Sequence, residues 1–184
     1  MAQESEFHIG RARHIWGSRD ISRYAEALPA YTEGLEAMAQ TLAAEETDGI
    51  LALGYSAKDM VADLDQVAAR LQIQIPRITG IVGQPAWNLY SGGQLAIEQY
   101  ERLGILFRNP VIIDDFAETA RKITDLHKVF RAFDIPDRYV VLYVNPEARE
   151  RFISLGIRVR SIIPGENPQL LDLLKQRRSP SSMT

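Results

Sequence analysis

Short, continuous hydrophobic segments alternate with amphipathic segments along most of the chain. Each hydrophobic segment has the length of a strand and is apolar at successive positions, which is typical of strands buried on both faces of a sheet. We expect five such strands, at 49–54, 75–83, 111–114, 138–144 and 157–163.

The segments between these strands carry apolar residues at the three- and four-residue spacing of helices. In the helical segment at 21–44, which precedes the first strand, Pro29 and Gly34 predict a short helix, a break and then a longer helix. We expect helices at 21–44, 58–71, 119–133, 147–155 and 168–176.

Strands that alternate with helices over most of a chain are typical of the α/β class. The sequence therefore predicts an open, mostly parallel twisted sheet of about five strands with helices on both faces. We expect a single domain at 20–177, an N-terminal arm at 1–19 and a disordered tail at 178–184. Ligands of such folds bind beyond the carboxyl ends of the strands, so the segments that follow strands are the candidates for function.

Composition and charge restrict the class of partner. The 184 residues carry a net charge of −3, which gives no electrostatic argument for nucleic acid as the main partner. The absence of cysteine excludes disulfides, thiolate metal sites and a cysteine nucleophile. No apolar run is long enough to cross a bilayer, and no secretory signal is recognisable. We expect a soluble, cytoplasmic protein whose ligand is a small molecule and not a nucleic acid or a membrane, with a homodimer as one possible assembly.

Two adjacent carboxylates, Asp114 and Asp115, stand at the end of the predicted third strand. Carboxylates accept hydrogen bonds from the hydroxyls of a polyol and are hard ligands for hydrated Mg²⁺. The next residues, 117–122, turn into a helix, whose free N–H groups and dipole favour an anion. Together these features favour a sugar phosphate, most simply ribose 5-phosphate. The alternative is structural, with one aspartate capping the turn and Thr119 as the N-cap of the helix.

The segment at 110–123, PVIIDDFAETARKI, resembles the motif with which type I phosphoribosyltransferases bind phosphoribosyl pyrophosphate (PRPP). Hydrophobic residues lead into the two acids, and Phe116 holds the hydrophobic position that follows. The resemblance implies that Asp114 and Asp115 are the catalytic residues, which bind the ribose hydroxyls of PRPP and its Mg²⁺. It also implies that the next loop binds the 5′-phosphate, and this loop corresponds to Glu118, Thr119, Ala120, Arg121 and Lys122.

Two further strand-end segments are expected at the same edge of the sheet. The resemblance implies that Ser56, Ala57 and Lys58, after the first strand, bind the pyrophosphate of PRPP; alternatively, Ser56 caps a plain turn. The segment at 83–94 matches a mobile loop that closes over the active site in this family. Alternatively, its Trp87 and Tyr90 pack on a neighbouring helix or a subunit partner.

The leading hypothesis is a phosphoribosyltransferase that binds PRPP with Mg²⁺ and transfers phosphoribose to a nitrogenous acceptor. Both expected anion loops lack the glycines that the family prefers, which favours as an alternative a non-catalytic, regulatory module that binds PRPP or a nucleotide. In either case we expect the ligand to be a small phosphoribosyl compound or a nucleotide. An acid pocket of a phosphatase or receiver-like domain ranks last, because those folds usually place the key acid after the first strand. The three histidines, His8, His14 and His127, lack the spacing of a zinc site.

Overall fold

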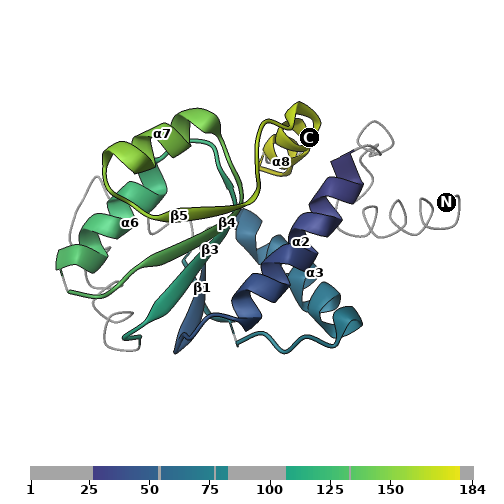
Figure 1. Cartoon of the computed structure of the whole chain (residues 1–184), viewed down its shortest axis with the longest axis horizontal. Coiled ribbons are helices and arrows are strands. Elements are labelled where there is room, and N and C mark those ends of the chain that lie inside the picture. The colour runs from purple at the N-terminus through teal and green to yellow at the C-terminus, as the bar shows by residue number, and fades with distance from the viewer. Residues whose placement is uncertain (1–26, 54, 77, 83–106, 133, 179–184) are drawn as a thin grey trace, which may run out of the picture.

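The computed structural model describes residues 27–53, 55–76, 78–82, 107–132 and 134–178. Its strands form one sheet of five in the order β2-β1-β3-β4-β5. Every strand is parallel to its neighbours, and Figure 1 shows β1, β3, β4 and β5 side by side. The strands are β1 (Gly49–Leu53), β2 (Ile78–Val82), β3 (Pro110–Ala117), β4 (Arg138–Val144) and β5 (Val159–Ile163).

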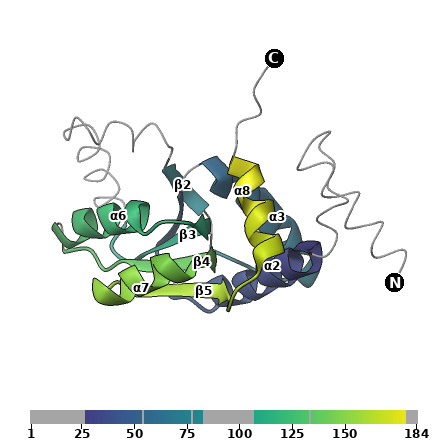
Figure 2. The ribbon, with the colours of Figure 1, turned by 90° about the horizontal axis from the view of Figure 1, so that it is seen from above.

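Helices cover both faces of this sheet, as Figures 1 and 2 show. One face carries α2 (Ala27–Ala43), α3 (Tyr55–Leu71) and α8 (Pro168–Arg178), and the other carries α6 (Arg121–Ala132) and α7 (Pro146–Ser154). The predicted α/β class, with a parallel sheet between helices, is confirmed.

Each face of the sheet has its own buried hydrophobic cluster. Successive residues of a strand point to opposite faces. In β1, accordingly, Ile50 and Ala52 pack with α2, α3 and α8, whereas Leu51 and Leu53 pack with α6 and α7. Burial on both faces explains why the strands read as continuous apolar runs in the sequence.

The order of the strands reverses between β1 and β3. From β1 the chain moves outward to β2, and it then returns to the other side of β1 and continues through β3, β4 and β5. At such a reversal the helices that follow the two central strands lie on opposite faces and leave a crevice at the carboxyl ends of the strands. Here those helices are α3 and α6, so this edge of β1 and β3 is the place to look for a ligand site.

The predicted break in the first helix is wrong, because α2 runs without interruption from Ala27 to Ala43. Pro29 is its third residue, and in the first turn the N–H that proline lacks has no partner within the helix. Gly34 does not end the helix, and its lack of a side chain allows α2 to pack closely on Ile163 and Leu142. A Cβ built on Gly34 would lie 2.6 Å from Cδ1 of Ile163 and 2.9 Å from Cδ1 of Leu142.

Three boundaries near the expected site also differ from the sequence prediction. β3 continues to Ala117 instead of ending at Asp114, because its backbone stays paired with β4 as far as the pair Ala117 and Val144. α3 begins at Tyr55, three residues earlier than expected, and α6 begins at Arg121, two residues later.

Several predictions fall outside the described residues. These are the arm at 1–19, the tail beyond Arg178, and the segment at 83–94 with Trp87 and Tyr90. Within the described part of the chain, no helix has both the length and the apolar character needed to cross a membrane.

Candidate functional site

The two aspartates lie inside β3, at the level where β1 ends. The last pair between the two strands joins Ala52 to Ile113, and Asp114 is the next residue of β3. Beyond this point β3 keeps its pairing with β4 alone. The pair therefore lies at the carboxyl edge of the sheet where the strand order reverses, as the sequence predicts, but within the strand and not beyond its tip.

Both side chains are buried, with Asp114 2% and Asp115 0% exposed. One oxygen of the Asp114 carboxylate accepts the backbone N–H of Asp115 at 2.9 Å. Burying adjacent carboxylates is costly unless hydrogen bonds, a cation or a ligand compensates for the lost water. Such a pair is therefore an unusual choice for a purely structural position.

The regular alternation of β3 is interrupted at this pair. Ile113 and Phe116 pack in the same hydrophobic cluster, although residues three apart in an ideal strand point to opposite faces. The ring of Phe116 stacks on that of Tyr143 in β4, with ring centroids 5.8 Å apart. Phe116 thus holds the buried, hydrophobic position that the sequence predicts and anchors the end of β3 to β4.

After β3, the residues Glu118, Thr119 and Ala120 form a short bend before α6. The first backbone bond of the helix runs from the N–H of Thr124 to the carbonyl of Ala120. Ala120 therefore holds the position before the helix, where its methyl group cannot accept a hydrogen bond, and Thr119 is not the N-cap. The N–H groups of the first turn, from Arg121 onward, thus lack a side-chain acceptor at the cap position and can face an anion.

This bend and α7, from Glu147 to Ser154, line an open cavity of about 500 Å³, to which neither Asp114 nor Asp115 contributes. The backbone N–H of Asn145, just before α7, donates to the carbonyl of Ala117 at 3.0 Å and so ties the two segments together. The charged side chains that line the cavity are Glu118, Glu147, Glu150 and Arg151. Three acids and one base disfavour a bare phosphate, whereas they suit a ligand with hydroxyls or one that brings a cation.

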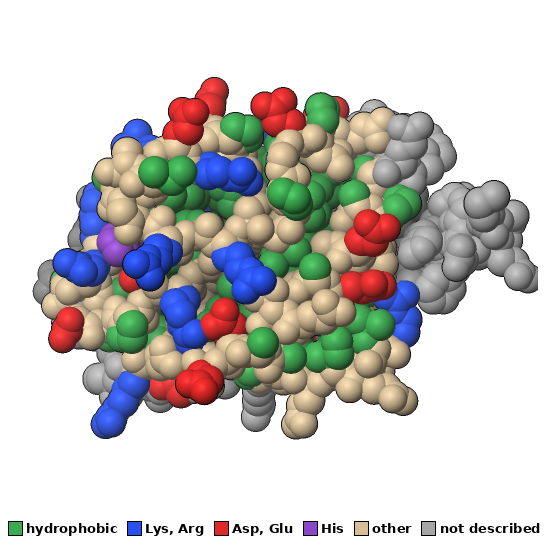
Figure 3. Space-filling model, in the orientation of Figure 1, with side chains coloured by type: hydrophobic (Ala, Val, Ile, Leu, Met, Phe, Trp, Pro, Cys, Tyr) green, Lys and Arg blue, Asp and Glu red, His purple; other side chains and the backbone are tan. Residues whose placement is uncertain are grey.

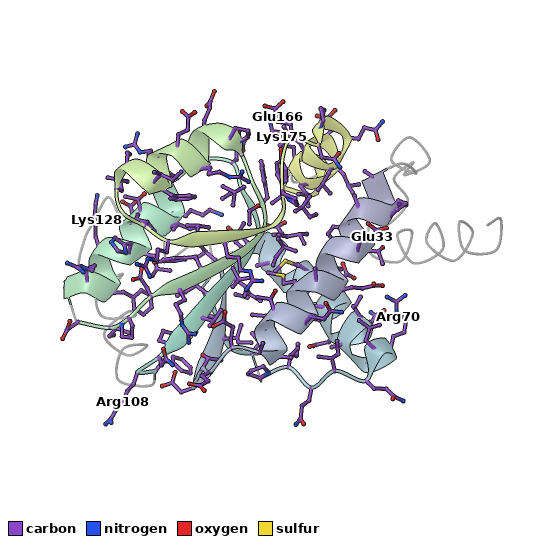
Figure 4. All side chains as sticks on the ribbon, viewed as in Figure 1. Glu33, Arg70, Arg108, Lys128, Glu166 and Lys175 are labelled. Atoms are coloured by element: carbon purple, nitrogen blue, oxygen red, sulfur yellow. The ribbon has the colours of Figure 1, made fainter. Side chains whose placement is uncertain are left out.

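The charged residues expected at the phosphate do not all lie at this cavity. Glu118 forms an ion pair at 3.3 Å with Lys175 of α8, which Figure 4 labels. Arg121 lies on the outer surface of α6, with its side chain 84% exposed and Nε 3.9 Å from Asp125. Lys122 is half-buried on the same helix. Of the expected phosphate residues, the structure thus brings Glu118, Thr119 and Ala120 to the cavity.

The predicted loop at Ser56, Ala57 and Lys58 is wrong, because all three residues belong to the first turn of α3. Only one residue separates the end of β1 at Leu53 from Tyr55. Ala57 is buried against the sheet and does not face a cavity among the described residues. Any contact between this segment and an anion would use the backbone N–H groups at the start of the helix.

The aspartates have the donor chemistry that Mg²⁺ prefers, which is hard carboxylate oxygen. Within the described ranges, no group of three or more His, Asp or Glu side chains could hold a metal ion by itself. In many phosphoryl-transfer sites, one or two carboxylates and the phosphates of the substrate share the ion. Asp114 and Asp115 fit a Mg²⁺ bound in that way.

Sequence reasoning missed two features. Glu147 and Arg151 line the cavity from α7. The sequence could have indicated them, because they follow the predicted strand at 138–144, and the carboxyl ends of neighbouring parallel strands meet at one edge of the sheet. Asp63 of α3 is buried, and its carboxylate accepts a hydrogen bond from the hydroxyl of Tyr31 at 2.8 Å. In the sequence Asp63 looks like any polar residue of an amphipathic helix.

No family model, curated protein or solved structure matches this chain. The geometry of the carboxyl edge and the residues that form it are therefore the basis for a function.

Proposed function

We propose that the chain binds PRPP with Mg²⁺ at the carboxyl edge of β1 and β3 and transfers its phosphoribosyl group to a nitrogenous acceptor. The main support is the position of Asp114 and Asp115 at the reversal of strand order, directly before the bend and helix start of residues 118–121. Diol-binding acids beside a helix start that favours an anion match the two ends of a phosphorylated ribose.

Each group has a defined task in this proposal. The carboxylates of Asp114 and Asp115 accept hydrogen bonds from the ribose hydroxyls and stabilise the positive charge that develops on the sugar. The N–H groups at the start of α6 bind the 5′-phosphate. Asp114 and Asp115 would hold Mg²⁺ together with the ligand, and the ion would supply positive charge for the departing pyrophosphate. The bond from the sugar carbon to pyrophosphate breaks, and a bond from that carbon to the acceptor nitrogen forms.

A second candidate is a non-catalytic module that binds PRPP or a nucleotide in a regulatory role. The observation that favours it is the single residue between β1 and α3, which leaves almost no loop to surround a pyrophosphate. The start of α6 can bind the one phosphate group of a nucleoside monophosphate when a cation offsets the acids of the neighbouring cavity.

Calorimetry separates the two candidates. The full chain is titrated with PRPP plus Mg²⁺, with ribose 5-phosphate and with nucleoside monophosphates, and pyrophosphate release is followed in the presence of purine and pyrimidine bases. Binding of PRPP with base-dependent release of pyrophosphate supports the transferase. Binding of monophosphates without any release supports the regulatory module.

The matched variants are Asp115→Asn and Asp172→Asn. Asp172 is an exposed residue of α8 that does not line the cavity of the candidate site, so its replacement removes the same charge at a position outside the proposed contacts. We expect loss of binding in the first variant only. If no phosphoribosyl compound binds the parent protein at millimolar concentration, both candidates are wrong.

A further inference from the structure

An open cavity lies at the amino ends of β4 and β5, at the opposite end of these strands from the aspartate pair. Its volume is about 730 Å³, within the range of small-molecule sites. It is formed at the amino-terminal ends of β4 and β5 and by the last residues of α7 with the turn that follows them.

The charged groups of this cavity are predominantly basic. Arg138, Arg158 and Arg160 line it together with a single acid, Glu45. This excess of positive charge is local, because the chain as a whole carries −3. Figure 3 shows blue side chains gathered beside the purple histidine, on the face of the molecule where Figure 1 shows β5.

The three arginines are not equivalent. Arg138 pairs with Glu45, and its guanidinium also donates to the carbonyl of Glu46 and to the side chain of Asn109. Arg158 and Arg160 are exposed, and neither has an ion pair or a hydrogen-bonded acid within the described part of the chain. They are two residues apart at the start of β5 and both line the cavity, so their like charges repel each other. An anion bound between them removes that repulsion.

The cavity also has an apolar wall. Ile157 and Val159 contribute from the turn and from β5, and Ile153 of α7 is 71% exposed, the most exposed of the large hydrophobic residues that the structure describes. Guanidinium groups bind phosphate in a bidentate manner and stack on flat rings. An apolar wall beside them favours a ligand with a ring or another hydrophobic part over a bare inorganic anion.

We propose that this cavity is a second ligand site, which takes a small phosphorylated molecule with an aromatic or other apolar part. Arg158 and Arg160 bind its phosphate, and Ile153 contacts its ring. Arg138, which forms an ion pair with Glu45, adds positive charge to the lining. The site is distinct from the proposed PRPP site, because the two cavities share no lining residue and the aspartate pair lies at the carboxyl edge of the sheet.

The test uses phenyl phosphate, which has a ring and a phosphate but no ribose, and follows the backbone amide signals of the isotope-labelled full chain by NMR. We expect shifts centred on residues 156–160. Arg158→Gln and Arg160→Gln should each weaken binding about tenfold, since each removes a charge-assisted hydrogen bond. Ile153→Ala should weaken phenyl phosphate and leave inorganic phosphate unchanged.

Arg108→Gln is the matched control. Arg108 is exposed at the start of the neighbouring strand, does not line the cavity, and points away from the body of the protein in Figure 4. An equal loss of affinity in Arg108→Gln would show that binding follows net charge alone and would overturn the proposal. It is also wrong if the signals of residues 156–160 do not move, or if inorganic phosphate binds as tightly as phenyl phosphate.

Discussion

Gly34 of α2 lies so close to Ile163 of β5 that a Cβ on the glycine would approach Cδ1 of the isoleucine to 2.6 Å. The same Cβ would lie 2.9 Å from Cγ1 of Ile163 and from Cδ1 of Leu142. A glycine in the middle of a helix costs about 1 kcal/mol relative to alanine. Here it allows α2 to pack directly on β4 and β5, which holds one helical layer against the sheet.

We therefore expect Gly34→Ala to destabilise the protein although alanine is the better helix former. Overpacking costs about 1–3 kcal/mol against a gain of about 1 kcal/mol in helix propensity, which leaves a net loss of up to about 2 kcal/mol. Urea denaturation measures the change in the free energy of unfolding. In the double variant Gly34→Ala/Ile163→Val the loss should be smaller than the sum of the two single losses, because valine lacks Cδ1.

The control for this prediction is Ala37→Gly at an exposed position of the same helix. Because Ala37 is exposed, this change alters only the helix propensity, and we expect it to lower the free energy of unfolding by about 1 kcal/mol. A Gly34→Ala variant that is more stable than the parent by that same amount would contradict close packing at Gly34.

The second prediction concerns the hydrogen bond between Tyr31 and Asp63. Tyr31→Phe removes the hydroxyl that donates to a buried carboxylate, which should cost about 1.5–3 kcal/mol of stability. The measurement is the midpoint of chemical denaturation. Tyr143→Phe is the matched control, because the Tyr143 hydroxyl accepts only a long bond of 3.5 Å from the N–H of Asn167, and we expect a smaller loss there.

The third prediction concerns the connection at the amino ends of β1 and β3. The two carboxylate oxygens of Asp48 accept the backbone N–H groups of Arg108 and Asn109, at 2.5 and 3.0 Å. Asp48→Ala leaves both donors to water, so we expect a loss of about 1–3 kcal/mol in thermal or chemical denaturation. Asp65→Ala, at an exposed position of α3, should change stability by less than about 0.5 kcal/mol. Equal effects of the two changes would show that the Asp48 bonds contribute nothing.

The fourth prediction separates a ligand-binding from a structural role of the aspartate pair. Asn keeps the size of Asp114 or Asp115 and one acceptor oxygen, but a charge-assisted bond to the ligand becomes a neutral one. We expect about a tenfold loss of affinity for PRPP, equivalent to about 1–2 kcal/mol. The melting temperature should stay the same or rise, because neutralising one of two adjacent buried carboxylates removes their repulsion.

The structural interpretation makes the opposite forecast for the same variants. If Asp114 serves only to bind the N–H of Asp115, its replacement lowers the melting temperature and leaves ligand binding as in the parent. Calorimetry and thermal melting of Asp114→Asn and Asp115→Asn, each beside Asp172→Asn, therefore decide between the two roles.

The sequence predicted best those elements whose pattern is local. The strand at 138–144 has the predicted boundaries, because its apolar run is bounded by charged or turn residues at both ends. Long-range contacts decided the boundaries that differ. Pairing with β4 extends β3 past its two acids, and packing against β5 keeps α2 continuous through Gly34.

By itself, then, the sequence determined the class of fold and the position of the acid pair at the end of a buried strand, because hydrophobic periodicity reports the burial of each segment separately. The tertiary structure alone decided which strands are neighbours, and with that the reversal of order between β1 and β3. It also decided that Asp114 and Asp115 are buried, that α7 lines a cavity together with the bend at 118–120, and that Arg138 and Arg160 line another cavity from two neighbouring strands. These features depend on contacts between residues far apart in the chain, which no local pattern of polar and apolar positions specifies.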